Sequence, residues 1–446
     1  MDDRYYHSIE FHNEKCEVSL HCVRVCPTQA IRVKKNGIEY IEERCIDCGE
    51  CVKVCPNEAI TAKTNDLSEF EHFDHLVAIP SPTLYTQFGR EVGPFQVIEA
   101  LKHIGFDDVY PMTWTCEAVY LAIKEFVKDY EGEYPLISSS CPVVVRLLQV
   151  RYPEMLKQII PIDVPKEIAA KQMKAEAARR LGINPDKIGA VYITPCSAKM
   201  ISIKQPAEKE KSNLDGAISI KDIYNKLYAE IVRLKKEEDF QSKTEKISKT
   251  RRMMGPITKQ SLYWSVLGGD KNMAERGGWL TVSGLENIIR LFDDLEKGKL
   301  RNVKYLQLLA CRDGCIGGPL TVENLYIARA TALHRIEELP DLPESKKKEY
   351  IERFRRGEFN FEGRVKPRKL NNSGNIIEAI KKKKTKDEIY EQLPDIDCGI
   401  CGAPTCLSFA EDVVNGFSVL EDCIFFAQDN MIEIKDRFKN RKKDKS

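Results

Sequence analysis

The sequence predicts a multi-domain protein of the α/β class, and three observations lead to this prediction. The chain has 446 residues, which at about 100–200 residues per domain gives room for two to four domains. Its middle part alternates short apolar runs with amphipathic helical patterns, as in parallel sheets whose strands are connected by helices. Its 16 cysteines gather near both ends and at scattered positions between them. We expect an α/β domain over residues 71–340, a small α+β domain over residues 1–70 and a small helical module over residues 386–440.

The composition excludes several classes of protein. Hydrophobic residues make up 42% of the chain, enough for buried cores, and a formal net charge of +1 argues against a general nucleic-acid binder. The chain has no run of 18 apolar residues, and its first residues, MDDRYYHSIEF, lack an apolar signal core, so we expect neither a membrane span nor export. The expected location is cytoplasmic, where thiols stay reduced and clustered cysteines indicate metal ligands rather than disulfides.

An internal repeat organises residues 1–70. A shift of 29 residues places its first half on its second, and the second copy, CIDCGECVKVCP, has the C-x2-C-x2-C-x3-C-P spacing of a two-cluster bacterial ferredoxin. Thiolates are soft ligands that suit iron–sulfur clusters, and in this motif the fourth cysteine of a run crosses to the other cluster. We therefore predict a ferredoxin-like domain with two 4Fe-4S clusters. The ligands assigned to one cluster are Cys26, Cys45, Cys48 and Cys51, and those assigned to the other are Cys16, Cys22 and Cys55.

The second of these clusters lacks one cysteine, because Ser19 stands where the repeat has Cys48. Three interpretations remain open. Ser19 or a nearby side chain such as His21 ligates the fourth iron, or the cluster has only three irons, or the site is empty. A non-cysteine ligand or an open iron would shift the reduction potential. Zinc is a further alternative for the second copy of the motif, but the repeat and both Cys-Pro pairs favour a ferredoxin.

Four apolar runs in the middle part predict strands, and three of them contain cysteines. The runs cover residues 75–85, 137–145, 188–198 and 303–315, and helical patterns cover residues 95–106, 115–130, 166–183 and 285–300. Sites in such domains lie at the carboxyl ends of the parallel strands, so loops on one edge can converge. We expect four cysteines to form one buried cluster there, namely Cys141, Cys196, Cys311 and Cys315.

The residues around these cysteines match a known family. SSSCP at 138–142, TPCSAK at 194–199 and ACRDGCIGGP at 310–319 resemble the three signature loops of the [FeFe]-hydrogenase catalytic domain. The resemblance covers roughly residues 10–340, that is, the ferredoxin segment and the middle domain. Because the chain ends with a four-cysteine module, the whole is more similar to the divergent, sensory branch of the family than to the fast hydrogen-evolving enzymes.

This resemblance implies a cofactor and roles for particular residues. The four cysteines of the middle domain would bind the four-iron half of the six-iron H-cluster, and Cys315 would bridge to a diiron subsite that carries carbon monoxide, cyanide and a dithiolate amine. Lys199 matches the family lysine that contacts a cyanide ligand, since a cyanide-bearing site in a dry pocket needs a cationic donor nearby. Three glycines would permit close approach of the backbone to the cluster, with an ordinary turn as the alternative: Gly314, Gly317 and Gly318.

Other positions depart from the active members of the family. Ser140 stands where active members have a cysteine that relays protons, and an alcohol does not readily form its anion near neutral pH. Ser202 occupies the position of an acidic residue, and Gln307 and Leu309 stand where glutamate and methionine are common. Each departure weakens either proton delivery or the tuning of the cluster by the side chains around it, whereas the cluster cysteines remain. The pattern predicts a retained metal site with slow turnover.

Cys116, within TWTCEAVYL, belongs to none of these motifs. The family resemblance places it near the start of a helix beside the H-cluster. One interpretation is a small buried apolar residue, which is the usual role of an isolated cysteine. The other interpretation is catalytic, with Cys116 as a substitute proton relay or as an oxidation-sensitive switch.

A charged, partly helical connector is expected over residues 341–385, before the last cysteine group. This group has the spacing C-x2-C-x4-C-x16-C, which resembles the four-cysteine iron–sulfur module of several anaerobic electron-transfer and corrinoid proteins. Four thiolates can hold zinc or a 4Fe-4S cluster, and the other cysteine motifs of the chain favour the cluster. Cys406 opens an apolar-periodic stretch and is expected at a helix start, where free N–H groups stabilise negative sulfur. The predicted ligands are Cys398, Cys401, Cys406 and Cys423.

Two functions follow from these predictions. The first is a low-activity [FeFe]-hydrogenase-like oxidoreductase that binds or slowly turns over dihydrogen (2H⁺ + 2e⁻ ⇌ H₂). Electrons would pass through the 4Fe-4S clusters to or from a soluble carrier such as ferredoxin, or to a signalling partner. The second is a non-catalytic electron-transfer or iron–sulfur assembly protein whose middle domain holds only a 4Fe-4S cluster. Lys199 favours the first function, and Ser140 favours the second.

Overall fold

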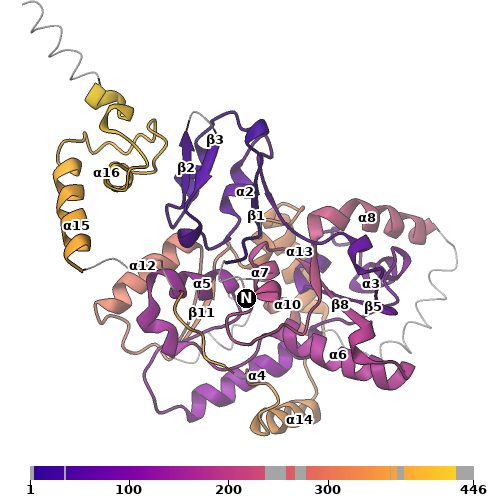
Figure 1. Cartoon of the computed structure of the whole chain (residues 1–446). Helices are drawn as coiled ribbons and strands as arrows, with labels where there is room; N and C mark the ends of the chain where they lie inside the picture. Colours follow the sequence, from indigo (N-terminus) through magenta and orange to yellow (C-terminus); the bar gives the residue numbers. More distant parts are fainter. Residues whose placement is uncertain are drawn as a thin grey trace, which may run out of the picture. The chain divides into compact units, whose positions relative to one another are not determined.

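A computed structural model of the chain describes residues 5–34, 37–236, 258–266, 278–361, 363–368 and 376–427 (Figure 1). The chain divides into two compact units, and each is considered by itself. Of the residues that the structure describes, those within 5–8, 46–49 and 62–368 belong to the first unit, and those within 9–45, 50–61 and 376–427 belong to the second. None of the described helices is long and apolar enough to cross a membrane.

Two parallel sheets form the centre of the first unit, which confirms the predicted α/β class. The larger sheet has the strand order β6 (Asp108–Val109), β5 (His75–Pro80), β8 (Ile188–Thr194) and β9 (Gly216–Ser219). The smaller sheet has the order β10 (Trp279–Ser283), β11 (Tyr305–Leu309) and β7 (Leu136–Ile137). The helices of this unit are α3 (Pro94–His103), α4 (Thr113–Asp129), α5 (Pro142–Arg151), α6 (Pro165–Leu181), α7 (Ala198–Lys204), α8 (Ile220–Lys236), α10 (Lys259–Tyr263), α12 (Leu285–Glu296), α13 (Leu325–Glu338) and α14 (Glu344–Arg355).

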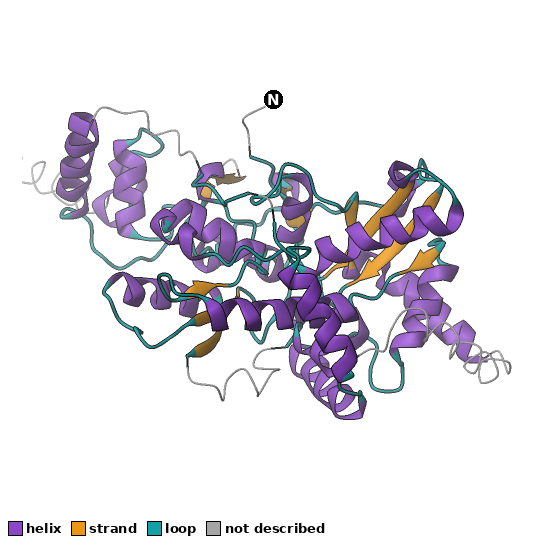
Figure 2. Cartoon of the chain, turned by 90° about the horizontal axis from the view of Figure 1, so that it is seen from below, coloured by secondary structure: helices purple, strands orange, loops and turns teal. Residues whose placement is uncertain are grey.

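Helices cover both faces of the larger sheet (Figure 2). On β8, Val191 and Ile193 belong to the apolar cluster that includes residues of α3 and α8, whereas Ala190 and Tyr192 belong to the cluster that includes residues of α6. All seven residues of β8 are buried, so the strand appears in the sequence as an unbroken apolar run rather than an alternating one. Full burial of each large apolar side chain contributes about 1.5–3 kcal/mol to folding. This burial holds the carboxyl end of β8, and the loop that follows it, in a fixed place.

The smaller sheet is covered in the same way. On β11, Leu306 and Leu308 pack in the cluster that contains Phe292 of α12 and residues of α5. Tyr305, on the opposite face of the same strand, packs with Ala122 of α4. The loops that follow β7 and β11 therefore leave a sheet that is buried on both faces.

All four predicted strands end before their apolar runs do, and two of them differ most from the prediction. The strand expected over residues 75–85 ends at Pro80, because Pro82–Thr86 forms a 3-10 turn in which the Ser81 side chain accepts a hydrogen bond from the Thr83 N–H group (3.4 Å). The run over 137–145 was wrongly assigned to a strand beyond Ile137. Its three valines lie in α5, where Pro142 occupies the first turn and tertiary burial outweighs the β preference of valine.

The second unit contains short strands and helices around the cysteine motifs. Strands β1 (Ile9–Phe11) and β4 (Ile60–Ala62) pair, and β2 (Ile31–Lys34) and β3 (Gly37–Tyr40) form an antiparallel hairpin. The helices are α1 (His21–Val25), α2 (Glu50–Val54), α15 (Ile376–Tyr390) and α16 (Cys406–Val414). Helix α16 begins at Cys406, as the sequence predicted, and the Thr405 side chain caps it by accepting a hydrogen bond from the Ser408 N–H group (3.0 Å). Parts of the predicted connector and C-terminal module, residues 362, 369–375 and 428–440, lie outside the described residues.

Candidate metal centre

Three loops of the first unit bring four cysteines to one small cavity. The loops follow β7, β8 and β11, whose strands run parallel within their sheets, and each loop leaves the carboxyl end of its strand. The cavity has a volume of about 70 Å³. Its wall includes Cys116, Cys141, Cys196, Lys199, Cys311 and Cys315.

Local backbone chemistry shapes each of the three loops. Cys141 occupies the N-cap position of α5 directly before a proline, which fixes the start of that helix. The Thr194 hydroxyl accepts a hydrogen bond from the Cys196 N–H group (3.1 Å) and donates one to the Cys196 carbonyl (3.0 Å), so the chain turns sharply after β8. Cys315 begins a 3-10 turn that follows Gly314, whose φ of 91° favours glycine.

The remaining glycines of the third loop allow close backbone contact, Gly317 within its own loop and Gly318 with the second loop. A Cβ atom added to Gly318 would lie 2.3 Å from the Pro195 carbonyl oxygen, and one added to Gly317 would lie 2.3 Å from the Arg312 carbonyl oxygen. The second and third loops also share a hydrogen bond from the Leu320 N–H group to the Pro195 carbonyl (3.0 Å). Gly314 and Gly318 line the cavity, but Gly317 does not. Gly317 and Gly318 thus allow backbone segments to meet closely.

Lys199 places a half-buried positive charge at the cavity wall. Its Nζ atom lies 3.9 Å from the Cys315 Sγ atom and donates a hydrogen bond to the Tyr192 hydroxyl (3.4 Å). Burial alone would lower the pKa of Lys199, but the Cys315 thiolate, with Tyr192 and Cys196, outweighs burial and raises it well above its usual value. Lys199 therefore stays cationic beside the sulfur atom that the family resemblance assigns to the bridge.

The cysteine sulfur atoms are poised for metal binding rather than for existence as free thiolates. Burial raises the pKa of Cys196 to about 11, although Lys199 opposes this effect, and burial also raises the pKa of Cys141. The backbone N–H groups of Ala310 and Val144 bond to the Cys141 sulfur and partly offset its burial. Metal binding must therefore release protons from thiols. Four soft sulfur donors on one cavity, two of them with backbone N–H partners, fit the four-iron half of an H-cluster.

Ser140 lies between this cavity and a larger one. The larger cavity has a volume of about 570 Å³, and both cavities are lined by Ser140, Pro142, Val164 and Lys166. The Ser140 side chain is half-buried, and its N–H group donates a hydrogen bond to the Ser138 hydroxyl (3.2 Å). Ser140 thus belongs to the wall that the metal cavity and the larger cavity share.

The other departures from the family pattern lie around the same cavities. Leu309 lines the metal cavity, and Ser202 lines the larger cavity while donating a hydrogen bond to the Lys199 carbonyl (2.9 Å). Gln307 lies on β11, where its side-chain carbonyl accepts a hydrogen bond from Thr281 (3.3 Å). None of these three side chains carries an ionisable proton.

Cys116 lies in the first turn of α4, and its side chain is fully buried at the cavity wall. The Trp264 indole donates a hydrogen bond to the Cys116 carbonyl (3.0 Å), which anchors this turn. Burial raises the pKa of the Cys116 thiol well above its usual value, and Glu117 adds to this effect. The thiol is therefore neutral at physiological pH.

A second cation, Lys166, lies buried at the metal cavity and was not predicted from the sequence. Lys166, in the first turn of α6, lines this cavity and pairs with Glu167, with 2.6 Å between Lys166 Nζ and Glu167 Oε1. Burial alone would raise the pKa of Glu167, but Lys166 and Lys209 hold it at about 2. Both side chains are almost wholly buried. The Val-Pro pair before Lys166 marks a helix start, but nothing in the sequence indicates that this helix begins at the cavity.

The second unit places predicted ferredoxin ligands together. Cys16, Cys22 and Cys55 line one small cavity with Ser19, whereas His21 is exposed and does not line it. The same N–H to sulfur hydrogen bond, 3.2 Å long, occurs in each copy of the repeat. The Ala30 N–H group donates to the Cys26 sulfur, and the Ala59 N–H group donates to the Cys55 sulfur. Such bonds tune the reduction potential of an iron–sulfur cluster.

The last four cysteines also share a cavity, at the start of α16. Cys398, Cys401, Cys406 and Cys423 line it, together with apolar residues that include Leu393 and Phe409. The Cys406 N–H group donates a hydrogen bond to the Asp397 carboxylate (2.6 Å), which ties the first cysteine loop to the helix. Four thiols and no histidine in this wall suit a metal cluster of the iron–sulfur type.

Comparison with known families supports these three sites. The model of the iron-only hydrogenase large subunit, C-terminal domain, matches residues 74–319, which is more than half of the chain. A 4Fe-4S dicluster domain matches residues 8–56, and an Fe-S cluster domain matches residues 393–425. All of the predicted cysteine ligands lie within these three ranges.

Individual relatives are distant. Iron hydrogenase 1 of Clostridium pasteurianum is 23% identical over 293 residues, which cover 54% of this chain and 50% of that protein. Cytosolic Fe-S cluster assembly factor NAR1 of Sclerotinia sclerotiorum is 30% identical over 73 residues, or 16% of this chain and 13% of that protein. The solved structure of [FeFe]-hydrogenase HydA1 from Chlamydomonas reinhardtii is 15% identical with a TM-score of 0.46, and the match covers 66% of this chain and 95% of that one.

The chain spans about half the length of the curated hydrogenases that it matches. The family match itself is extensive, and it includes all three signature loops that meet at the metal cavity. We conclude that this protein is a divergent member of the iron-only, or [FeFe], hydrogenase family.

Proposed function

We propose that this protein is a low-activity, sensory [FeFe]-hydrogenase that binds or slowly turns over dihydrogen. The observation that carries this proposal is the metal cavity. It keeps four cysteines and the half-buried Lys199, yet Ser140 lies in its wall in place of a thiol. A protein that only held a four-iron cluster would have no evident use for a half-buried cation directed at Cys315.

Each group in the cavity has a defined task in this proposal. Cys141, Cys196, Cys311 and Cys315 would hold the H-cluster. When bound, the H-cluster supplies the redox and dihydrogen chemistry, as cofactors generally supply the demanding step. Lys199, whose Nζ atom lies 3.9 Å from the Cys315 sulfur, would donate a hydrogen bond to an anionic ligand of the bound cluster.

Proton delivery limits the rate in this proposal. A thiol with a pKa near 8.5 can release and recover a proton at neutral pH, whereas the Ser140 hydroxyl cannot readily do so. A well-placed acid–base group is worth about 10²–10⁴-fold in rate. Slow turnover suits a sensor, because the oxidation of a little dihydrogen to protons and electrons reduces the clusters while most of the dihydrogen remains.

Electrons would leave or arrive through the ferredoxin-like clusters and the C-terminal cluster. The external partner would be a soluble one-electron carrier such as a ferredoxin, or a signalling protein that responds to the redox state. The repeated N–H to sulfur bonds at Cys26 and Cys55 support such a role, since they adjust cluster potentials.

A second candidate function is non-catalytic work in electron transfer or iron–sulfur cluster assembly. Two observations favour it: Ser140 removes the expected relay, and part of the chain is similar to an Fe-S cluster assembly factor. In this case Cys141, Cys196, Cys311 and Cys315 would hold only a four-iron cluster.

Infrared spectroscopy after anaerobic co-expression with the maturation proteins separates the two functions. The hydrogenase proposal predicts bands of metal-bound carbon monoxide and cyanide, and iron analysis near 18 irons per chain if every predicted site is filled. The Cys315→Ala variant is the matched control, and it should lack these bands. Their absence from the parent protein, under conditions that mature a known hydrogenase, would favour the second function.

A further inference from the structure

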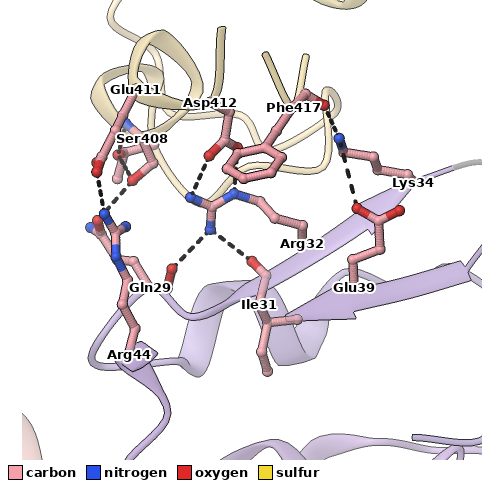
Figure 3. Close-up of polar contacts among 11 residues, drawn as sticks. Gln29, Ile31, Arg32, Lys34, Glu39, Arg44, Ser408, Glu411, Asp412 and Phe417 are labelled. Atoms are coloured by element: carbon pink, nitrogen blue, oxygen red, sulfur yellow. Dashed lines mark hydrogen bonds and ion pairs between the residues drawn. The ribbon is translucent and has the colours of Figure 1, made fainter. Parts of the chain in front are cut away.

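Within the second unit, the C-terminal module is fixed to the ferredoxin-like hairpin by a buried ion pair (Figure 3). The guanidinium group of Arg32, on β2, binds the Asp412 carboxylate of α16 through two nitrogen atoms. The Nη2–Oδ1 distance is 3.0 Å, and Nε contacts the other carboxylate oxygen. The side chains of Arg32 and Asp412 are only 5% and 4% exposed. Such a bidentate pair orients the two elements as well as holding them together.

The third nitrogen atom of the Arg32 guanidinium group also has hydrogen-bond partners. This atom, Nη1, donates hydrogen bonds to the carbonyls of Gln29 (2.8 Å) and Ile31 (3.1 Å), so Arg32 is held by its own hairpin before it reaches Asp412. Buried ion pairs often add little net stability, because desolvation offsets their attraction, but they fix one arrangement of the packed elements. The pair therefore indicates a defined docking geometry rather than a loose association.

Further contacts surround this ion pair. The Ser408 hydroxyl donates to the Gln29 side-chain carbonyl (2.7 Å), and the Val33 N–H group donates to the Gly402 carbonyl (3.1 Å). A Cβ atom at Gly402 would lie 1.9 Å from the Val33 carbonyl oxygen, so the two backbones meet at a distance that only glycine allows. Two more contacts lie at the edge of this interface: Arg44 with Glu411, and Lys34 with the Phe417 carbonyl.

The interface residues are close in sequence to predicted cluster ligands on both sides. On the ferredoxin side, the Gln29 N–H group donates a hydrogen bond to the Cys26 carbonyl (3.1 Å). On the other side, Ser408 lies two residues after Cys406, and Gly402 directly follows Cys401. A short route of covalent bonds and one hydrogen bond therefore runs from Cys26 through Gln29 and Ser408 to Cys406.

We infer that this interface holds the C-terminal cluster as a fixed electron-transfer partner of the ferredoxin cluster ligated by Cys26. Arg32 and Asp412 are positioning residues in this relay. One electron leaves the reduced C-terminal cluster and reduces the oxidised ferredoxin cluster, or the reverse, and no bond or proton is exchanged. A low-potential one-electron carrier of the ferredoxin class supplies or accepts the electron at the C-terminal cluster. The inference shares with the proposed function only the presence of these two 4Fe-4S clusters.

The fixed geometry matters because electron tunnelling weakens steeply as the gap between two clusters grows. A module tethered only by its connector would sample many separations, most of them too long for rapid transfer. A buried bidentate pair beside the connecting route keeps the separation constant. The C-terminal module is then the site at which an external carrier exchanges electrons with the protein.

The test uses the full chain with its 4Fe-4S clusters but without the diiron subsite, reduced by dithionite. We expect electron paramagnetic resonance to show magnetic coupling between the reduced C-terminal and ferredoxin clusters. Asp412→Arg, which places two cations together, should abolish the coupling at unchanged iron content, and the swap Arg32→Asp/Asp412→Arg should restore at least part of it. The matched control is Lys382→Gln, since Lys382 forms an exposed ion pair on α15. Coupling in Asp412→Arg equal to that of the parent would overturn the inference.

A second measurement does not depend on the folding of interface variants. Cys423→Ser should remove only the C-terminal cluster, and the spin relaxation of the ferredoxin clusters should then become slower than in the parent. Unchanged relaxation would show that the clusters are not close, and the inference would fail. Because neither readout involves the diiron subsite, a negative infrared result would leave this inference intact, and the failure of this test would leave the hydrogenase proposal intact.

Discussion

The Nζ atom of Lys199 lies 3.9 Å from the Sγ atom of Cys315, inside a cavity that four further cysteines of the same unit line. The two residues are 116 positions apart in the sequence, and the ends of β8 and β11 bring them together. An ammonium group that is partly shielded from water is costly unless negative charge faces it. The pair therefore indicates that this cavity is built for an anionic metal centre.

Replacement of Lys199 by alanine should prevent retention of the diiron subsite. The four cysteines would remain, so iron analysis should still show the four-iron cluster, whereas the infrared bands of carbon monoxide and cyanide should be lost. Lys204→Ala is the control, because Lys204 ends the same helix α7 but is exposed. Bands of full intensity in Lys199→Ala would show that the cation has no part in holding the subsite.

Replacement of Ser140 by cysteine should raise turnover. The new thiol would lie between the metal cavity and the larger cavity and could exchange protons near neutral pH. We expect dihydrogen–deuterium exchange to rise by about 10²-fold or more, with unchanged infrared bands. Ser139→Cys adds the same thiol one residue earlier, where it lines only the larger cavity, and should have no such effect. Equal rates in the parent and in Ser140→Cys would mean that proton delivery at this position does not limit turnover.

Replacement of Cys116 by alanine should leave the exchange rate unchanged. The thiol is fully buried, and its raised pKa keeps it neutral, so a packing role suits it better than a relay. The lost sulfur atom should lower the free energy of unfolding by about 1 kcal/mol, measured by thermal denaturation. A large drop in exchange with intact infrared bands would instead support the catalytic role that the sequence left open.

Glu167→Gln should destabilise the protein, because it leaves the buried Lys166 without its carboxylate partner. Loss of one member of a buried pair costs about 3–5 kcal/mol. The pKa of Glu167 is held at about 2, below its ordinary value of 4.5, so its contribution is complete above pH 4.5 and is lost as the pH falls toward 2. Chemical denaturation at pH 7 and pH 4 tests this, with the exposed Glu176→Gln on the same helix as control. A Gln variant as stable as the parent at pH 7 would contradict this account of the pair.

Much of the metal site could be predicted from the sequence, because short motifs determine it. The spacing of the cysteines and the loops around Cys141, Cys196 and Cys311 indicated the family without any coordinates. The α/β class followed from apolar runs such as the one that forms β8, which is buried on both faces. Where one run joined two elements, as at Val143–Val145, periodicity alone could not separate the end of a strand from the beginning of a helix.

Features that arise from contact between distant segments could not be predicted. Lys166 resembles an ordinary residue at a helix start, and only the packing of α6 places it at the metal cavity. Arg32 and Asp412 are separated by 380 positions, and each resembles a surface residue of its own element. Their ion pair depends on the folding of two cysteine modules whose local motifs carry no information about each other.

The most direct test of the central claim is an anomalous-scattering map at the iron edge from crystals of the anaerobically matured protein. The account predicts four irons bonded to the sulfur atoms of Cys141, Cys196, Cys311 and Cys315, and two more beyond Cys315 on the side of Lys199. Four irons alone would contradict the hydrogenase proposal, and a cavity without iron would contradict the account of the site as a metal centre.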